Sequence, residues 1–454
     1  MLITISRTLE SLQSWSKTIT SVFISICVLM SSAWIVKLIV ANQPVVIERI
    51  EMPIILDELG LRGDIVVQRV LDQLDLLKTV AVIDKSESAI FRAVAAKPEI
   101  KIEATVVGGL PVKSIEQGLN FVLGKRVKTI TGEITRKPTT DERDQQFEGR
   151  LRVDNKVISK RTVNLKTDDL DTLVRQLSFD LYAHFEPFRA ALAAWRLGDY
   201  EMARDVLRPL VVSANSEDRK YSLWLRSKLA SARQEETDLM EALSIDPNFH
   251  MALVSLSDVY RRRKDFDGGA AFADQAIAAA PESPLGYHEK GRNLREANRT
   301  AEAIVAYRTA CSRSVPYAPC HNQLGEIFME QGSVLLDEPG RLSAEGVEKY
   351  RQAQTEFIKA IKVDPAHVWA HSNGAYVAIA LGDHREGLIL ANRAKSLDPK
   401  APAHQLRYAW ALLRSGNKSD ARAILDEIVS KQPEWAANPV GGWGNRFILR
   451  QLAN

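Results

Sequence analysis

A pattern that recurs every 34 residues in the C-terminal part of the chain restricts the fold more than any other feature. The line GAYVAIALGDHREGLILANRAKSLDP ends at Pro399, and the line YAWALLRSGNKSDARAILDEIVSKQP ends at Pro433, 34 residues later. Gly382 and Gly416 occupy equivalent places in the two lines. A fixed period of this length is typical of stacked units in which each repeat buries its apolar face against its neighbours.

Each unit is predicted to be a pair of helices that cross at a small residue and end at a proline. The small residue allows close approach of the two backbones, and the proline stops the second helix because it has no backbone N–H. The small residues are Ala203, Gly269, Ala303, Ala353, Gly387 and Ala421, and the prolines are Pro247, Pro281, Pro365, Pro399 and Pro433. These residues resemble the tetratricopeptide repeat family, which implies an all-α superhelical array of about seven units over residues 184–433.

Two regions depart from the regular pattern. About 16 extra residues separate Gly332 from the small residue Ala353, so an insertion is expected near residues 333–350. Such an insertion is either a passive elaboration or a contact surface, and both interpretations remain open. Residues 434–454 are expected to form a C-terminal segment that caps the last helix pair.

The preceding part of the chain, residues 44–183, predicts a small α+β domain. The order of elements indicates one sheet with helices on one face, and Asp154-Asn155 indicates a hairpin between the last two strands. Dinucleotide, P-loop, serine-hydrolase and zincin motifs do not occur in the chain. The predicted strands are 45–52, 101–107, 127–136, 145–153 and 156–165, and the predicted helices are 64–77, 114–123 and 168–182.

An apolar stretch near the N-terminus predicts a membrane anchor. The 19 residues between Lys17 and Lys37 are uncharged and would span about 28 Å as a helix, enough to cross a bilayer. A cleaved signal peptide or a buried helix are the alternatives, but no small-x-small cleavage site closes the run. We therefore expect a short N-terminal segment over 1–17, a transmembrane anchor over 18–41 in contact with the lipid bilayer, and a single-pass membrane protein. Flanking charges favour C-terminal domains in the periplasm of a bacterial envelope, with the cytoplasm as the alternative.

Charge and motif content exclude several functional classes. The chain has 60 basic and 57 acidic residues, and a net charge of +3 gives no argument for nucleic-acid binding. Its three cysteines include no C-x-x-C pair, and His367 with His371 lacks an evident third ligand. We expect a protein that is not an enzyme and that has no catalytic residue, no cofactor and no metal.

The family resemblance implies a concave groove lined by the first helix of each unit. The side chains projected onto that face pass from polar and basic to aromatic, which suits an extended protein or peptide partner. For each tryptophan, a place in the core between repeats is the alternative. The candidate groove residues are Arg261, Arg262, His288, Arg292, Arg295, Asn322, Glu326, Trp369, Tyr376 and Trp410.

Cys311 and Cys320 flank a short connection between two units. In an oxidising compartment a disulfide between them could staple this turn, and free buried thiols are the alternative. Together these features predict a membrane-anchored scaffold or adaptor that binds partners in the groove of the array. The alternative is a transmembrane sensor or regulator that transmits partner binding through the α+β domain.

Overall fold

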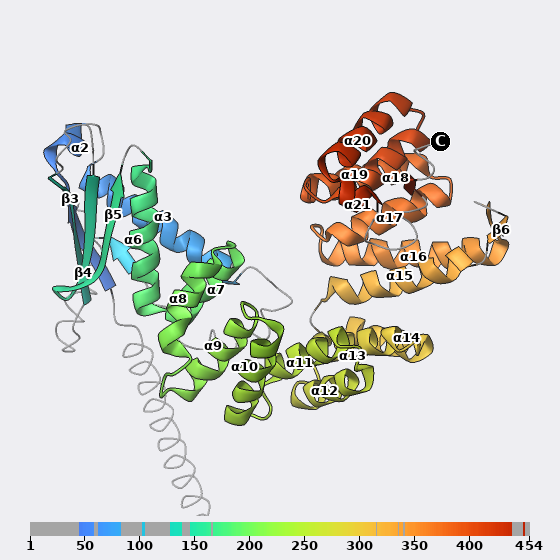
Figure 1. Ribbon diagram of the computed structural model, residues 1–454, viewed down its shortest axis with the longest axis horizontal. Coiled ribbons are helices and arrows are strands. Elements are labelled where there is room, and N and C mark those ends of the chain that lie inside the picture. The colour runs from blue at the N-terminus through green and yellow to red at the C-terminus, as the bar shows by residue number, and fades with distance from the viewer. Residues whose placement is uncertain are drawn as a thin grey trace, which may run out of the picture. The chain divides into compact units, whose positions relative to one another are not determined.

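The computed structural model describes residues 45–58, 62–82, 102–104, 128–138, 146–164, 167–314, 316–334, 336–338, 341–437 and 448–449. The chain divides into two compact units, Met1–Ser213 and Ala214–Asn454, and both are drawn in Figure 1. The predicted helix at 114–123 and the predicted anchor at 18–41 lie outside the described residues. The architecture is a mostly helical repeat array with a small N-terminal sheet region.

The membrane prediction requires a correction. Within the described ranges, none of the helices combines the length and the apolar character needed to cross a bilayer. Among the described residues this finding contradicts the expectation of a single-pass membrane protein with periplasmic C-terminal domains, whose predicted anchor at 18–41 lies outside them.

The first unit contains a five-stranded mixed sheet in the order β2-β1-β3-β4-β5. Strand β1 pairs in parallel with β2 and with β3, whereas β3, β4 and β5 form an antiparallel meander. Asp154 and Asn155 close the β4–β5 hairpin with φ values of 48° and 66°, a backbone region that Asp and Asn tolerate. The strands are β1 (Val45–Glu51), β2 (Ile102–Ala104), β3 (Lys128–Arg136), β4 (Gln146–Val153) and β5 (Lys156–Asn164).

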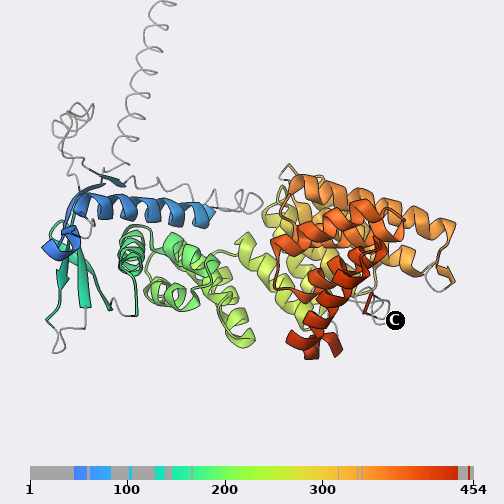
Figure 2. The ribbon, with the colours of Figure 1, turned by 90° about the horizontal axis from the view of Figure 1, so that it is seen from above.

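The helices α3 (Gly63–Val82) and α6 (Leu170–Phe185) pack against each other and against this sheet, as Figure 2 shows for α3 beside the strands. The short α2 (Ile54–Glu58) precedes α3. Gly149 of β4 allows α6 to approach closely, because a Cβ atom there would lie 2.7 Å from the Leu177 side chain. Asp169 caps α6 by accepting a hydrogen bond of 2.6 Å from the Thr172 N–H.

Paired helices make up the rest of the described chain. The pair α7 (Pro187–Arg196) and α8 (Tyr200–Leu210) belongs to the first unit. The second unit contains α9 (Ser216–Ser227), α10 (Ala232–Ile245), α11 (His250–Arg262), α12 (Phe266–Ala279), α13 (Pro284–Glu296), α14 (Thr300–Cys311), α15 (Ala318–Val334), α16 (Ala344–Val363), α17 (Val368–Ala380), α18 (His384–Leu397), α19 (Pro402–Arg414), α20 (Lys418–Lys431) and α21 (Pro433–Ala437).

The turn inside several of the pairs has a recurring chemistry. The chain leaves the first helix through a residue with positive φ, which is Gly382 or Gly416 in the last pairs and Lys264 or Asn298 in earlier ones. After Lys264, Gly382 and Gly416 the next residue caps the second helix with a side-chain oxygen, as Asp383 does for the Glu386 N–H at 3.0 Å. This local chemistry fixes where one helix ends and the next begins.

Close packing of glycine against an aromatic ring joins the two helices of several pairs. Gly291 of α13 faces the fully buried ring of Tyr307, and Gly325 of α15, 34 residues later, faces Phe357. Helices α15 and α16 have 17 and 20 residues, and the short strands β6 (Leu336–Glu338) and β7 (Arg341–Leu342) form a hairpin between them. The extra residues of this pair therefore lengthen both helices and form the hairpin.

Candidate functional site

Three of the predicted groove arginines on α11 and α13 share the carboxylate of Asp258: Arg261, Arg262 and Arg292. Asp258 receives hydrogen bonds from Arg261 at 2.6 Å and from Arg292 at 3.0 Å, and Arg261 also pairs with Glu296 of α13. Burial alone would raise the pKa of Asp258, but the hydrogen bond from Arg261 and the nearby guanidinium charges lower it below its ordinary value. These ion pairs link two consecutive first helices.

The same kind of link continues from α13 through α15 to α17. Arg295 donates to Gln323 at 2.7 Å, to Glu326 at 2.9 Å and to Glu330 at 2.5 Å. On its other side, Glu326 accepts hydrogen bonds from Asn322 at 2.9 Å and from Asn373 at 3.2 Å. We refer to these hydrogen-bonded networks together as the first-helix ladder. Its members are Asp258, Arg261, Arg292, Glu296, Arg295, Glu326, Glu330 and Asn373.

Other predicted groove residues lie beside the ladder or in the core. Arg262 bonds both carboxylate oxygens of Glu235 of α10 at 2.7 Å. His288 is buried, with its ring 5.6 Å from Tyr307 and 5.2 Å from Tyr317. Tyr376 and Trp410 are only 4% and 5% exposed, and their rings lie 5.2 Å apart in the core between α17 and α19. Both rings therefore contribute to packing between repeats.

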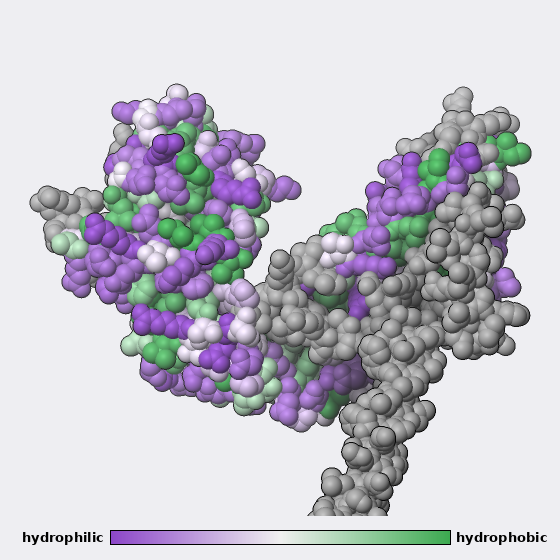
Figure 3. Space-filling model, turned by 180° about the vertical axis from the view of Figure 1, so that it is seen from behind, coloured by the Kyte–Doolittle hydropathy of each residue, from purple (hydrophilic) through white to green (hydrophobic). Residues whose placement is uncertain are grey.

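Trp369, in the first turn of α17, differs from the other candidates because it is 44% exposed. It lies beside His404 of α19, with ring centroids 4.7 Å apart, at the edge of a pocket of about 470 Å³. On the face that Figure 3 shows, hydrophobic residues form small patches separated by hydrophilic ones. The pocket is lined by His367, Val368, Trp369, Asp398, Ala401, Pro402, Ala403, His404 and Trp435.

The electrostatics of this Trp369 pocket leave it with one acidic group. Burial lowers the pKa of His404 and outweighs the opposing effect of the Asp398 charge, so its imidazole is neutral at pH 7. Burial likewise lowers the pKa of His367. Asp398 supplies the formal charge among the lining residues, and the remaining walls are aromatic or aliphatic. The pocket can therefore accept a side chain that is apolar along its length and positive at its end.

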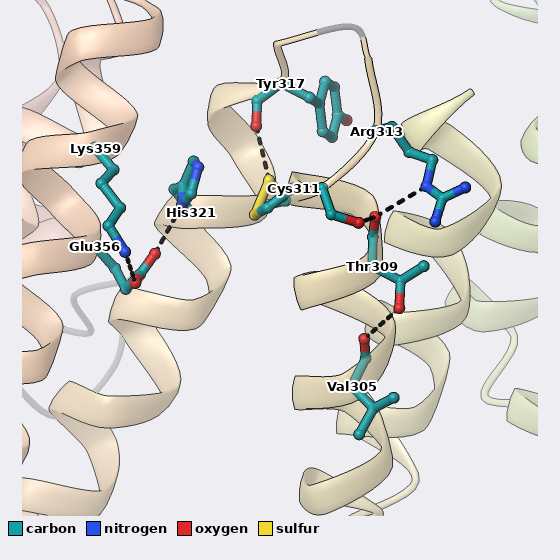
Figure 4. Close-up of a disulfide and its surroundings, with 10 residues drawn as sticks. Val305, Thr309, Cys311, Arg313, Tyr317, His321, Glu356 and Lys359 are labelled. Carbon is teal, nitrogen blue, oxygen red and sulfur yellow. Dashed lines mark hydrogen bonds and ion pairs between the residues drawn. A yellow bond between two sulfur atoms is a disulfide. The ribbon is translucent and has the colours of Figure 1, made fainter. Parts of the chain in front are cut away.

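The structure joins Cys311 and Cys320 in a disulfide, the pair for which the sequence allowed one. It links the end of α14 to the first turn of α15, with the two Cα atoms 5.6 Å apart. Figure 4 shows His321 beside it, oriented by a hydrogen bond of 2.7 Å between its Nδ1 and Glu356 of α16. Lys359 pairs with the same carboxylate at 2.7 Å.

Charged residues of the sheet form a separate polar cluster in the first unit. Glu148 of β4 pairs with Lys137 at 3.2 Å, with Lys160 at 3.4 Å and with Arg150. Burial would raise the pKa of Glu148, but hydrogen bonds from Lys137, Arg150 and Lys160 lower it. These basic residues of the hairpin region are thus held by an acidic partner.

The sequence did not indicate three of the residues that complete these sites. Trp435 and His404 join Trp369 from 66 and 35 positions away, and no local pattern marks them. Glu356 lies 35 residues after His321, close to the repeat period. Pairs of opposite charge at this spacing, such as Asp258 with Arg292 and Arg295 with Glu330, are a signal that the sequence does contain.

Comparisons with solved structures give low similarity. TTC0263, a TPR protein of Thermus thermophilus, is 16% identical, with a TM-score of 0.35 over 45% of this chain and 98% of its own. PilW, a type IV pilus biogenesis factor, is 16% identical, with a TM-score of 0.40 over 54% and 100%. YrrB, described as a TPR protein with an unusual peptide-binding site, is 13% identical, with a TM-score of 0.33 over 48% and 98%. No curated protein sequence matches the chain.

Family comparisons identify the repeats from the sequence itself. Two tetratricopeptide repeat family models match, one over residues 342–402 and the other over residues 378–437. Together the matches span α16 to α21, including every residue that lines the Trp369 pocket. The paired helices, their small crossing residues and these matches agree, and the chain contains tetratricopeptide repeats.

Proposed function

We propose that the chain is a scaffold that binds a protein or peptide partner through its repeats, with the Trp369 pocket as the anchoring point. Because it contains tetratricopeptide repeats, it belongs to a class that serves protein interaction in general. The single observation that carries the proposal is the exposure of Trp369 at the rim of a pocket inside the family-matched repeats. A large aromatic side chain that is half exposed beside a pocket is typical of a binding hot spot.

The chemistry of the pocket favours a partner with an arginine or lysine side chain. Trp369 and Trp435 offer π faces, and Asp398 offers a negative charge at the same pocket. An aliphatic stem would pack on the apolar walls while its cationic head meets Asp398. We do not propose the first-helix ladder as the binding surface, because its charges are already paired between neighbouring helices.

The proposal is tested by selecting peptides from a random-sequence library on the purified full chain. Selected peptides are expected to contain a conserved basic residue, and replacing that residue with norleucine should weaken binding. Fluorescence anisotropy then compares the wild-type chain with two variants of the pocket. Trp369→Ala should weaken binding by about 30-fold, and Asp398→Asn by about 3- to 10-fold.

A matched control comes from the second helix of the same repeat. Ile389 of α18 is a large apolar residue with an exposure of 55%, and it does not line the pocket. Ile389→Ala should therefore leave peptide affinity unchanged. Equal affinity of wild-type and Trp369→Ala chains for the selected peptides would refute the proposed binding point, and failure to select any peptide would refute the scaffold proposal.

A further inference from the structure

The clearest unassigned chemistry in the described residues surrounds the disulfide between α14 and α15. The sulfur atoms of Cys311 and Cys320 and a ring nitrogen of His321 all lie within 4.8 Å of one another. Two thiolates and an imidazole are the ligand types that Zn²⁺ prefers. We propose that reduction of this disulfide creates a zinc site made of Cys311, Cys320 and His321.

The distances suit a tetrahedral ion once the sulfur atoms are no longer bonded. Zinc–sulfur bonds of about 2.3 Å and zinc–nitrogen bonds of about 2.0 Å place the ligand atoms about 3.5 to 3.8 Å apart. The two sulfur atoms are bonded to each other in the structure and must separate to reach this range, and a ring nitrogen of His321 already lies within 4.8 Å of both. All three residues lie on the end of α14 and the first turn of α15. A rearrangement of cysteine side chains is therefore enough to form the site, and water can fill the fourth position.

The surroundings of His321 supply the support that a zinc-binding imidazole needs. Its Nδ1 lies 2.7 Å from Glu356, which leaves Nε2 as the nitrogen that can bind the ion. A carboxylate that accepts from the distal nitrogen fixes the ring and its tautomer in many zinc sites. Lys359 holds the carboxylate of Glu356 at 2.7 Å, and Figure 4 shows this carboxylate joined to both Lys359 and His321. This arrangement distinguishes the cluster from two cysteines that are merely close.

Formation of the zinc site requires reduction of the disulfide and then loss of the thiol protons. A dithiol reductant gives two electrons and two protons to the disulfide, the S–S bond breaks, and each cysteine becomes a thiol while the reductant becomes a disulfide. Zn²⁺ then forms bonds to both sulfurs and to the imidazole, and the two thiol protons pass to solvent. The same two cysteines thus hold the α14–α15 junction either by a covalent bond or through a metal ion.

The test uses Co²⁺ as a spectroscopic substitute for Zn²⁺ on the full chain. The protein is reduced with excess dithiol, desalted under argon and titrated with Co²⁺. Reduced wild-type chain should develop one equivalent of tetrahedral Co²⁺ absorption with thiolate charge-transfer bands, and one equivalent of Zn²⁺ should abolish them. Glu356→Gln should weaken binding by about 10- to 100-fold, and His321→Ala by at least as much.

Two controls separate this site from other thiols and from loss of folding. Cys27→Ser removes the third cysteine and should bind Co²⁺ like the wild-type chain. The oxidised wild-type chain, which has the same sequence and fold, should not bind. Absence of tetrahedral Co²⁺ bands in the reduced wild-type chain would overturn the proposal. Unchanged bands in a Cys311→Ser/Cys320→Ser chain, with helical content verified by circular dichroism, would overturn it as well.

Discussion

Gly291→Ala should destabilise the pair of α13 and α14, although alanine is the better helix former. Replacement of a helical glycine by alanine gains about 1 kcal/mol of helix propensity. At Gly291, however, the new Cβ would lie 2.7, 2.8 and 2.9 Å from three ring atoms of Tyr307, whose side chain is fully buried. Overpacking of this kind costs about 1 to 3 kcal/mol, so the net effect is a loss of about 1 kcal/mol.

The same substitution at Gly374 of α17 provides a matched control. There the nearest atoms to the new Cβ are a Leu390 carbon at 3.4 Å and a Phe357 carbon at 3.6 Å, which are ordinary packing distances. Gly374→Ala should therefore keep the gain of about 1 kcal/mol from helix propensity. The two variants should differ by about 2 kcal/mol, or about 30-fold in the equilibrium constant for local opening.

Hydrogen exchange measured by mass spectrometry on the full chain reads these local openings. Peptides from α13 and α14 should exchange faster in the Gly291→Ala variant, and peptides from α17 and α18 should exchange more slowly in the Gly374→Ala variant. If Gly291→Ala slowed exchange as much as Gly374→Ala does, contact between the glycine and the ring would not determine helix packing, and the reasoning would be refuted.

Two further predictions concern the turn of one repeat and the pH dependence of stability. Lys264 has a φ of 65° where later repeats use glycine, so Lys264→Gly should raise stability by about 1 kcal/mol in urea denaturation; a loss would contradict the turn assignment. Burial lowers the pKa of His250 below its ordinary 6.5, so the unfolded chain takes up this proton more readily. Stability should fall as the pH drops below 6.5, and His250→Asn should make this slope shallower, whereas an unchanged slope would contradict the assignment.

The repeat architecture could be predicted from the sequence because local chemistry determines it. Pro399 and Pro433 stop helices, and small residues such as Ala421 allow helices to cross, so a single line of sequence reveals each pair. The strands of the sheet could also be predicted, because the alternation of apolar and polar residues and the Asp154-Asn155 turn are patterns of only a few residues.

The candidate site was less predictable because it depends on side chains from different repeats. The sequence placed Arg292 and Arg295 on the groove side, but it did not reveal that Asp258 and Glu326 pair with them. Burial of Tyr376 in the core follows from its contact with Trp410, 34 residues away. Such pairings follow from the stacking of helices and become visible only when equivalent positions of neighbouring repeats are compared.

Hydrogen exchange of the full chain with and without a selected basic peptide shows where the peptide binds. We expect slower exchange at the N-terminal turns of α17 and α19, which carry Trp369 and His404, with little change in α11 and α13. Protection confined to α11 and α13, with none around Trp369, would place the partner on the first-helix ladder and contradict binding at the Trp369 pocket.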